Sequence, residues 1–258
     1  MVAGMSSRFG SKIKQMAQIG KNGETLIEIS VNQAICTGLI TKIIFITNHL
    51  SEMYFKNLFG EIYKNIDIEY IQQEFDTKTR IRPWGTIGAI CELKNKITEP
   101  FIVLNGDDLY GEDPIKNGIN FLIENKNNKI NIIGGCKLLN TLPEDGTVNR
   151  GIIEIEGGYV TELKEIINIS NKNIELYDKL ANVNFIGLHP YVLELLFCKL
   201  EEFKKKNSNN PKIECLLPNV LNELIHYNNL KMKYFEITNK IYGITNPDDA
   251  INLKNMNL

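Results

Sequence analysis

The chain has few of the features that would tie it to a membrane or to nucleic acid. Its 258 residues carry a formal net charge of -2 and a sequence pI near 6.0, so the basic excess typical of nucleic-acid binders is missing. The longest apolar runs are far too short to span a bilayer, and no charged n-region precedes an apolar h-region. We therefore expect no nucleic-acid partner, no membrane segment and no signal peptide.

Cysteine and histidine are sparse and widely scattered. The five cysteines include no C-x-x-C pair, which is typical of reduced thiols in a cytoplasm rather than of a disulfide framework or a zinc site. The three histidines also lie far apart, which favours ordinary structural roles over catalysis. We expect a cytoplasmic protein. The five cysteines are Cys36, Cys91, Cys136, Cys198 and Cys215, and the three histidines are His49, His189 and His226.

What the chain does have is a small-residue, basic stretch at its beginning. Residues 2–10 read Val-Ala-Gly-Met-Ser-Ser-Arg-Phe-Gly, and Lys12 and Lys14 follow. Small residues let backbone N–H groups converge on a phosphate, and the nearby cations supply fixed positive charge. The pattern predicts an anion cradle, with a flexible, solvated N-terminal segment as the alternative.

Beyond this stretch the pattern alternates between helices and buried strands. We expect helices over residues 26–35, 51–64 and 87–95, and strands over 42–47, 66–71 and 101–104. Such alternation predicts an α/β fold with a doubly wound, mostly parallel, Rossmann-like sheet and helices on both faces. Only three residues precede the glycine motif, so the strand expected before a phosphate loop is unusually short.

Two loops of this predicted sheet carry chemistry. Asn105-Gly106-Asp107-Asp108 directly follows the apolar run 101–104, so two carboxylates lie at the carboxyl end of a strand, where such sheets bind ligands. A solvated, Asp-rich turn is the alternative. The second loop runs from residue 72 to 86, carries Arg80 and ends in Pro83-Trp84-Gly85-Thr86.

The sequence pattern changes in the middle of the chain. Strands separated by glycine- and asparagine-rich turns over residues 136–190 predict a small antiparallel β side lobe. We expect one domain over residues 1–258, with a core at 1–135, the lobe at 136–190, and closing helices and a strand at 191–258. The sequence leaves the oligomeric state open, a homo-oligomer included.

Taken in order, these stretches resemble the sugar-phosphate nucleotidyltransferases, which join a nucleoside triphosphate to a sugar 1-phosphate. Residues 3–9 are similar to the family's A-G-x-[GS]-[ST]-R loop, and Lys14 to the lysine that follows it. Gly85-Thr86 with Ala89 is similar to the G-T-x-x-A nucleotide turn, and residues 106–108 to the G-D-[DN] metal motif. Residues 149–151, Glu165 and 184–187 fall where the family contacts the sugar phosphate.

The resemblance implies an in-line attack by a sugar-phosphate oxygen on the α-phosphorus, with pyrophosphate leaving and UTP or dTTP favoured. The family's roles, carried over residue by residue, make Arg8, Lys14 and Asp107 catalytic, with Asp107 also binding Mg²⁺ as cofactor. They make Ala3, Gly4, Met5, Ser6, Ser7, Arg80, Gly85 and Thr86 nucleotide-binding, and Gly151, Lys164, Glu165 and Asn184 sugar-phosphate-binding. The expected partners are therefore a nucleoside triphosphate and a sugar 1-phosphate.

The chain also departs from the family's pattern. Arg80 stands where many relatives have a glutamine that contacts a pyrimidine base, and Gly243 where many have a second metal-binding aspartate. Asp248 or Asp249 could replace that aspartate, although a role at a helix N-terminus is the commoner one. Two alternatives follow: a CTP-dependent cytidylyltransferase acting on a phosphorylated alcohol such as phosphocholine, and a non-catalytic nucleotide-binding subunit.

Overall fold

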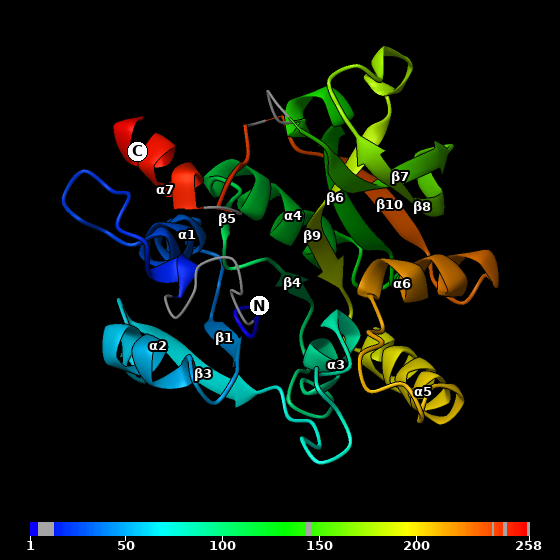
Figure 1. The fold of residues 1–258 in the computed structure, drawn as a ribbon, viewed down its shortest axis with the longest axis horizontal. Helices are drawn as coiled ribbons and strands as arrows, with labels where there is room; N and C mark the ends of the chain where they lie inside the picture. Colours follow the sequence, from blue (N-terminus) through cyan, green and yellow to red (C-terminus); the bar gives the residue numbers. More distant parts are fainter. Residues whose placement is uncertain (5–12, 143–145, 239, 245–246, 257–258) are drawn as a thin grey trace. The chain divides into compact units, whose positions relative to one another are not determined.

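The computed structural model describes residues 1–258 except 5–12, 143–145, 239, 245–246 and 257–258. The chain forms two compact units, each built from separate stretches of sequence (Figure 1). The first unit comprises residues 1–74, 104–117 and 239–258, and the second comprises residues 75–103 and 118–238. Among the described residues, no helix combines the length and apolar character needed to cross a lipid bilayer.

Among its described residues, the first unit contains a short mixed sheet, three α-helices, the 3-10 helix η2 and a strand pair near the acidic motif. Its elements are η2 (Lys14–Met16), α1 (Leu26–Cys36), β1 (Lys42–Thr47), α2 (Glu52–Phe59), β2 (Ile62–Tyr63), β3 (Ile66–Gln72), β5 (Asp108–Leu109), β11 (Tyr242–Gly243) and α7 (Pro247–Asn255). Strands β1 and β3 are parallel, β2 is antiparallel to β3, and β11 is antiparallel to β5.

Local sequence signals explain where the helices of this unit begin and end. Helix α1 starts with a capping box, in which Glu28 N donates to Thr25 Oγ1 and Thr25 N donates to the Glu28 carboxylate. Helix α2 stops at Phe59 because Gly60 adopts a φ of 63°, and β2 follows. The prediction of a helix through residue 64 was therefore wrong in its last turn.

The short start of the chain lies inside this unit. Val2 N donates to Ile46 O, Met1 N donates to Leu104 O, and Gly106 N donates to Met1 O. The bonds between Met1 and residues 104 and 106 have the pattern of a parallel bridge. Residues 1–2 thus lie between the end of β1 and the segment that carries the acidic motif, where the predicted first strand was expected.

A buried apolar cluster holds the first unit together. Phe45 on β1 stacks on Phe55 and Phe59 of α2, with ring centroids 5.5 and 5.1 Å apart. Val2 and Ile27 belong to the same cluster, so the chain start and α1 pack against the layer formed by β1 and α2. This packing fixes the segments that flank the phosphate-loop sequence.

The second unit is dominated by a sheet that closes on itself (Figure 1). Its elements are α3 (Thr86–Cys91), β4 (Phe101–Val103), β6 (Asn131–Lys137), η3 (Leu138–Thr141), β7 (Val148–Glu156), β8 (Tyr159–Ile169), η4 (Ile174–Leu176), β9 (Leu180–Leu188), α5 (Tyr191–Lys206), α6 (Leu217–His226) and β10 (Met232–Glu236), while α4 (Glu112–Glu124) contributes residues to both units. The strand order is β4-β9-β6-β10-β8-β7, and β7 also pairs with β9.

The fold is mixed α/β, as predicted, but its strand directions differ from the prediction. Within the described residues, parallel ladders between named strands are confined to β1–β3 and β6–β10. The remaining ladders are antiparallel, including those between β6 and β9 and between β4 and β9. A buried apolar strand looks the same in sequence whichever way its neighbour runs, which is why the composition of residues 101–103 and 131–137 did not reveal this.

Candidate active site

Lys14 and Asp107 come together in the first unit although they are 93 positions apart. The Lys14 ammonium donates to Asp107 Oδ2 in an ion pair, and the two side chains are 21% and 22% exposed. Lys14 begins the short helix η2, and Asp107 immediately precedes β5. The structure therefore brings two of the three predicted catalytic residues into contact and leaves both partly open to solvent.

Backbone contacts on both sides hold Asp107 in place. Its carbonyl accepts from Ile244 N at 3.0 Å, just beyond β11. Gly106, the residue before it, packs so closely on the chain start that a Cβ there would lie 2.3 Å from Val2 Cγ1. A side chain at position 106 would push these segments apart. The glycine of the predicted metal motif is thus needed for close packing.

Asp108, next to it, has a different environment. Its Oδ2 accepts from Asn105 Nδ2 at 3.0 Å and from the Tyr110 hydroxyl at 3.4 Å. Burial, and then the negative charge of Asp107, raise the pKa of Asp108 to about 6. The two carboxylates of the motif are therefore unequal: Asp107 forms an ion pair at a partly open position, and Asp108 is enclosed.

Only the beginning of the predicted phosphate loop falls among the described residues. Ala3 is buried and its carbonyl accepts from Asn48 Nδ2 at 2.9 Å, whereas Gly4 is exposed and a Cβ on it would meet nothing within 4 Å. The other predicted loop residues lie outside the described residues, and their roles remain predictions. These residues are Met5, Ser6, Ser7 and Arg8.

Arg80, in the second unit, is held by main-chain carbonyls. The side chain is 6% exposed, and its guanidinium donates to the carbonyls of Arg82, Asn210 and Ile213 at 3.0, 3.1 and 2.5 Å. The same group lies over the Trp84 ring, 3.3 Å from its centroid. These contacts favour a supporting role for Arg80 in the turn, and direct contact with a base remains a prediction.

Gly85 directly precedes helix α3, and Thr86 is the first residue of that helix. Gly85 has a φ of 81°, and a Cβ on it would lie 2.6 Å from Cys215 O. Thr86 Oγ1 accepts from Leu217 N at 2.8 Å, at the start of α6. The predicted nucleotide turn is therefore joined to residues 210–217, an association that the sequence did not indicate.

The predicted sugar-phosphate residues gather in the closed sheet of the second unit. Gly151 on β7 lies opposite Glu165 on β8, and Lys164 lies opposite Ile152. Asn184 has a φ of 59° where the register between β6 and β9 shifts, and its N–H donates to Asn182 Oδ1 at 2.8 Å. Irregularities of this kind redirect side chains and are common beside active sites.

Comparisons with known proteins identify the family. The family model for nucleotidyl transferases matches residues 10–234. The chain belongs to the nucleotidyl transferase family. No curated protein sequence matches it.

Solved structures share the fold of this nucleotidyl transferase over nearly its full length. A Bacillus anthracis protein assigned as a glucose-1-phosphate thymidylyltransferase, in complex with a sucrose, has a TM-score of 0.72 at 14% identity, covering 99% of this chain and 92% of that one. UDP-glucose pyrophosphorylase complexed with UDP-glucose gives 0.65 at 19%, with 99% and 95% covered. UDP-glucose pyrophosphorylase from Acinetobacter baumanii gives 0.68 at 15%, with 98% and 90% covered.

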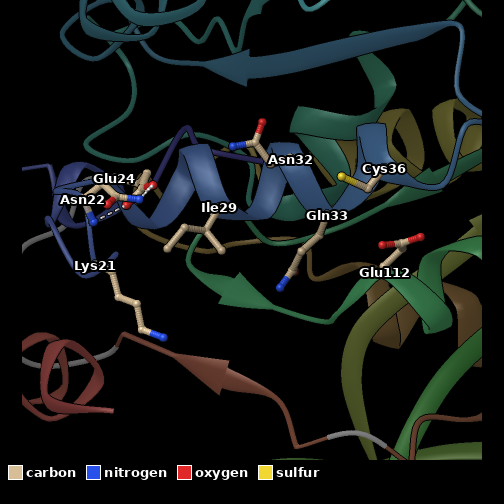
Figure 2. Close-up of a pocket in the computed structure, with 8 residues that line it drawn as sticks. All are labelled: Lys21, Asn22, Glu24, Ile29, Asn32, Gln33, Cys36 and Glu112. Carbon is tan, nitrogen blue, oxygen red and sulfur yellow. Dashed lines mark hydrogen bonds between the residues drawn. The ribbon is translucent and has the colours of Figure 1, made fainter. Parts of the chain in front are cut away.

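An open pocket of about 300 Å³ lies beside α1 of the nucleotidyl transferase (Figure 2). None of the predicted catalytic residues lines it. Several of its polar groups are already partnered: Asn22 donates to Glu24, Asn32 accepts from Lys64, and Gln33 accepts from Gly111 N. We therefore assign no ligand to this pocket.

Two asparagines, one in each unit, contact predicted site residues and were missed from the sequence. Asn48 binds the Ala3 carbonyl, and its Oδ1 also accepts from Leu50 N and Ser51 N, so it fixes the loop that meets the start of the phosphate motif. Asn182 is 8% exposed, and a Cβ on Gly151 would lie 3.5 Å from its Cβ. The Asn-x-Asn pattern at residues 182–184 could have pointed to Asn182.

Proposed function

We propose that this nucleotidyl transferase joins a nucleoside triphosphate, UTP or dTTP, to a sugar 1-phosphate in a Mg²⁺-dependent reaction that releases pyrophosphate. The contact between Lys14 and Asp107 carries the proposal. It places one cation and one carboxylate together at a partly open site, as nucleotidyl transfer requires. The glucose-1-phosphate thymidylyltransferase and UDP-glucose pyrophosphorylase structures support the choice of substrates.

In this reaction an oxygen of the sugar phosphate forms a bond to the α-phosphorus, and the bond to the bridging oxygen of pyrophosphate breaks. No protein nucleophile is needed, so the residues act by position and charge. Lys14 offsets the negative charge around the α-phosphate. The amides of residues 4–7 with Arg8 hold the β- and γ-phosphates until pyrophosphate leaves.

The residues present fit a magnesium ion. Mg²⁺ is commonly held by one or two carboxylates together with substrate phosphates, so a three-ligand protein cage is not required. Asp107 offers such a carboxylate, partly exposed and within the same unit as the phosphate motif. Bound there, the ion would neutralise charge on the triphosphate oxygens.

The second unit supplies the proposed recognition surfaces. Gly85 and Thr86, supported by Arg80, serve the nucleotide, and Gly151, Lys164, Glu165 and Asn184 serve the sugar phosphate. Phosphocholine would instead need an aromatic cage. Phe185, one aromatic that a cage in this lobe would use, is fully buried and stacks on Phe235 with ring centroids 5.7 Å apart. Phe185 is therefore closed to such a cage, and the Lys233 ammonium already lies 5.1 Å from the ring centroid of Tyr159, another aromatic of this lobe, which favours the sugar phosphate over the phosphorylated amine.

A substrate panel with matched variants tests the proposal. Pyrophosphate release is measured with UTP, dTTP and CTP, each paired with glucose 1-phosphate, another sugar 1-phosphate or phosphocholine. We expect turnover with UTP or dTTP and a sugar 1-phosphate, lost in Asp107→Asn and kept in Asp113→Asn, an exposed carboxylate on α4. Turnover only with CTP and phosphocholine, or none with any pair despite tight nucleotide binding, contradicts the proposal.

The proposal extends to the organisation of the chain. We propose one functional domain assembled from the core at 1–135, the lobe at 136–190 and the closing segment at 191–258, in a cytoplasmic enzyme whose subunits are free to form a homo-oligomer. We propose that the doubly wound, Rossmann-like description applies to the first unit, where β1 and β3 are parallel and residues 1–2 lie beside the acidic motif.

A further inference from the structure

Strand β11 brings Gly243 directly against Asp108. The two residues are paired in the antiparallel ladder between β11 and β5. A Cβ on Gly243 would lie 2.2 Å from Asp108 Oδ1, a separation that no real contact allows. The space beside Gly243 is therefore filled by the Asp108 carboxyl group, and any larger residue at position 243 would displace it.

The other oxygen of this carboxyl group closes a small hydrogen-bond ring. Asn105 N donates to the Tyr110 hydroxyl at 3.4 Å, that hydroxyl donates to Asp108 Oδ2, and Asn105 Nδ2 donates to the same oxygen. Tyr110 is 1% exposed, so the ring is anchored in the interior. It ties together both ends of the turn that carries Asp107.

We propose that Asp108 and Gly243 are positioning residues that hold Asp107 at the metal site, an inference that rests on the proposed function. Asp108 fixes the turn at 105–110 through Asn105 and Tyr110, and Gly243 leaves the room that its carboxyl group needs. Asp107 is thereby kept against Lys14, with its carbonyl bonded to Ile244 N.

The contacts favour positioning over a second metal ligand. Asp108 uses Oδ2 for the ring with Asn105 and Tyr110, and its Oδ1 faces the backbone of Gly243. Groups that hold a metal-binding residue in place are often worth about 10- to 100-fold in metal affinity. We therefore expect changes at either position to weaken metal binding, although neither residue touches the ion.

Titration of the metal-free protein with Mn²⁺, monitored by electron paramagnetic resonance, tests the positioning role. Turnover of UTP and glucose 1-phosphate is a second readout. Asp108→Ala and Gly243→Ala should each weaken Mn²⁺ binding about tenfold. Asp108→Asn keeps an acceptor oxygen for Asn105 and Tyr110 and should bind close to wild type. Because both changes break one arrangement, the double variant Asp108→Ala/Gly243→Ala should lose little more than either single one.

The outcomes separate this inference from the proposed function. Wild-type Mn²⁺ binding by Asp108→Ala, or equal losses in Asp108→Asn and Asp108→Ala, overturns the positioning role; the second result would make Asp108 a ligand. Wild-type binding by Asp107→Asn would instead overturn the metal site of the proposed function. Circular dichroism checks folding, and if Gly243→Ala does not fold, the two Asp108 variants decide.

Discussion

The guanidinium carbon of Arg80 lies 3.3 Å from the centroid of the Trp84 ring. Stacking on one side and three carbonyl acceptors at the edge leave this side chain enclosed within the second unit. Two of those acceptors, Asn210 and Ile213, come from the segment that leads to α6. Arg80 therefore links the predicted nucleotide turn to a distant part of the same unit.

Replacing Arg80 tests this link. Arg80→Lys keeps the charge but loses the planar fork and the stacked contact, so we expect a loss of about 2–3 kcal/mol in the free energy of unfolding and a higher KM for the nucleotide. Urea denaturation and initial-rate kinetics measure the two effects. Arg82→Lys is the control, since Arg82 is exposed and pairs with Glu214 at 3.5 Å. Unchanged stability in Arg80→Lys would contradict the link.

Gly85 offers a test with a closely matched control. Gly85 and Gly158 have φ angles of 81° and 80°, but a Cβ on Gly85 would lie 2.6 Å from Cys215 O, while one on Gly158 would meet nothing within 4 Å. Gly158→Ala should therefore cost only the backbone strain, about 1 kcal/mol, and Gly85→Ala several times more. Thermal and urea unfolding compare them. Equal losses would show that close approach to Cys215 does not matter.

Lys14 should affect chemistry more than folding, because its ammonium is partly exposed and its partner is a carboxylate at the site. Removing one preorganised charge typically lowers turnover by about 100- to 1,000-fold, which we expect for Lys14→Met. Lys14→Arg should recover part of the rate. The control, Lys21→Met, removes an exposed lysine from the same unit. Wild-type turnover in Lys14→Met would exclude Lys14 from catalysis.

The enclosed carboxyl group of Asp108 makes stability depend on pH. Its pKa is raised from 3.8 to about 6, so the folded state holds the proton more tightly than the unfolded chain. Metal-free protein should therefore lose stability as pH rises from about 4 to 6 and level off above, by on the order of 3 kcal/mol. Asp108→Asn cannot titrate and should lack this component. Parallel pH profiles for the two proteins would contradict the assignment.

Predictions from single sequence segments were the most successful. The helix expected over residues 26–35, which the structure places at 26–36, was recognised because its apolar face is a local feature. The end of α2 was misplaced because the predicted helix was carried past Gly60, whose positive φ ends it. The role of Asn48 was missed for another reason: nothing in the sequence near position 48 indicates that its side chain binds the Ala3 carbonyl.

The amino-acid sequence by itself determined the family: the order of small, basic and acidic motifs is enough to indicate a nucleotidyl transferase and to nominate residues for its site. Only the tertiary structure decided that Lys14 contacts Asp107, that Arg80 donates hydrogen bonds to the carbonyls of residues 210 and 213, and that Gly243 leaves room for the Asp108 carboxyl group. The physical reason is that these contacts depend on the pairing of strands and segments far apart in the chain, and that pairing is settled by burial of the whole core rather than by any local pattern.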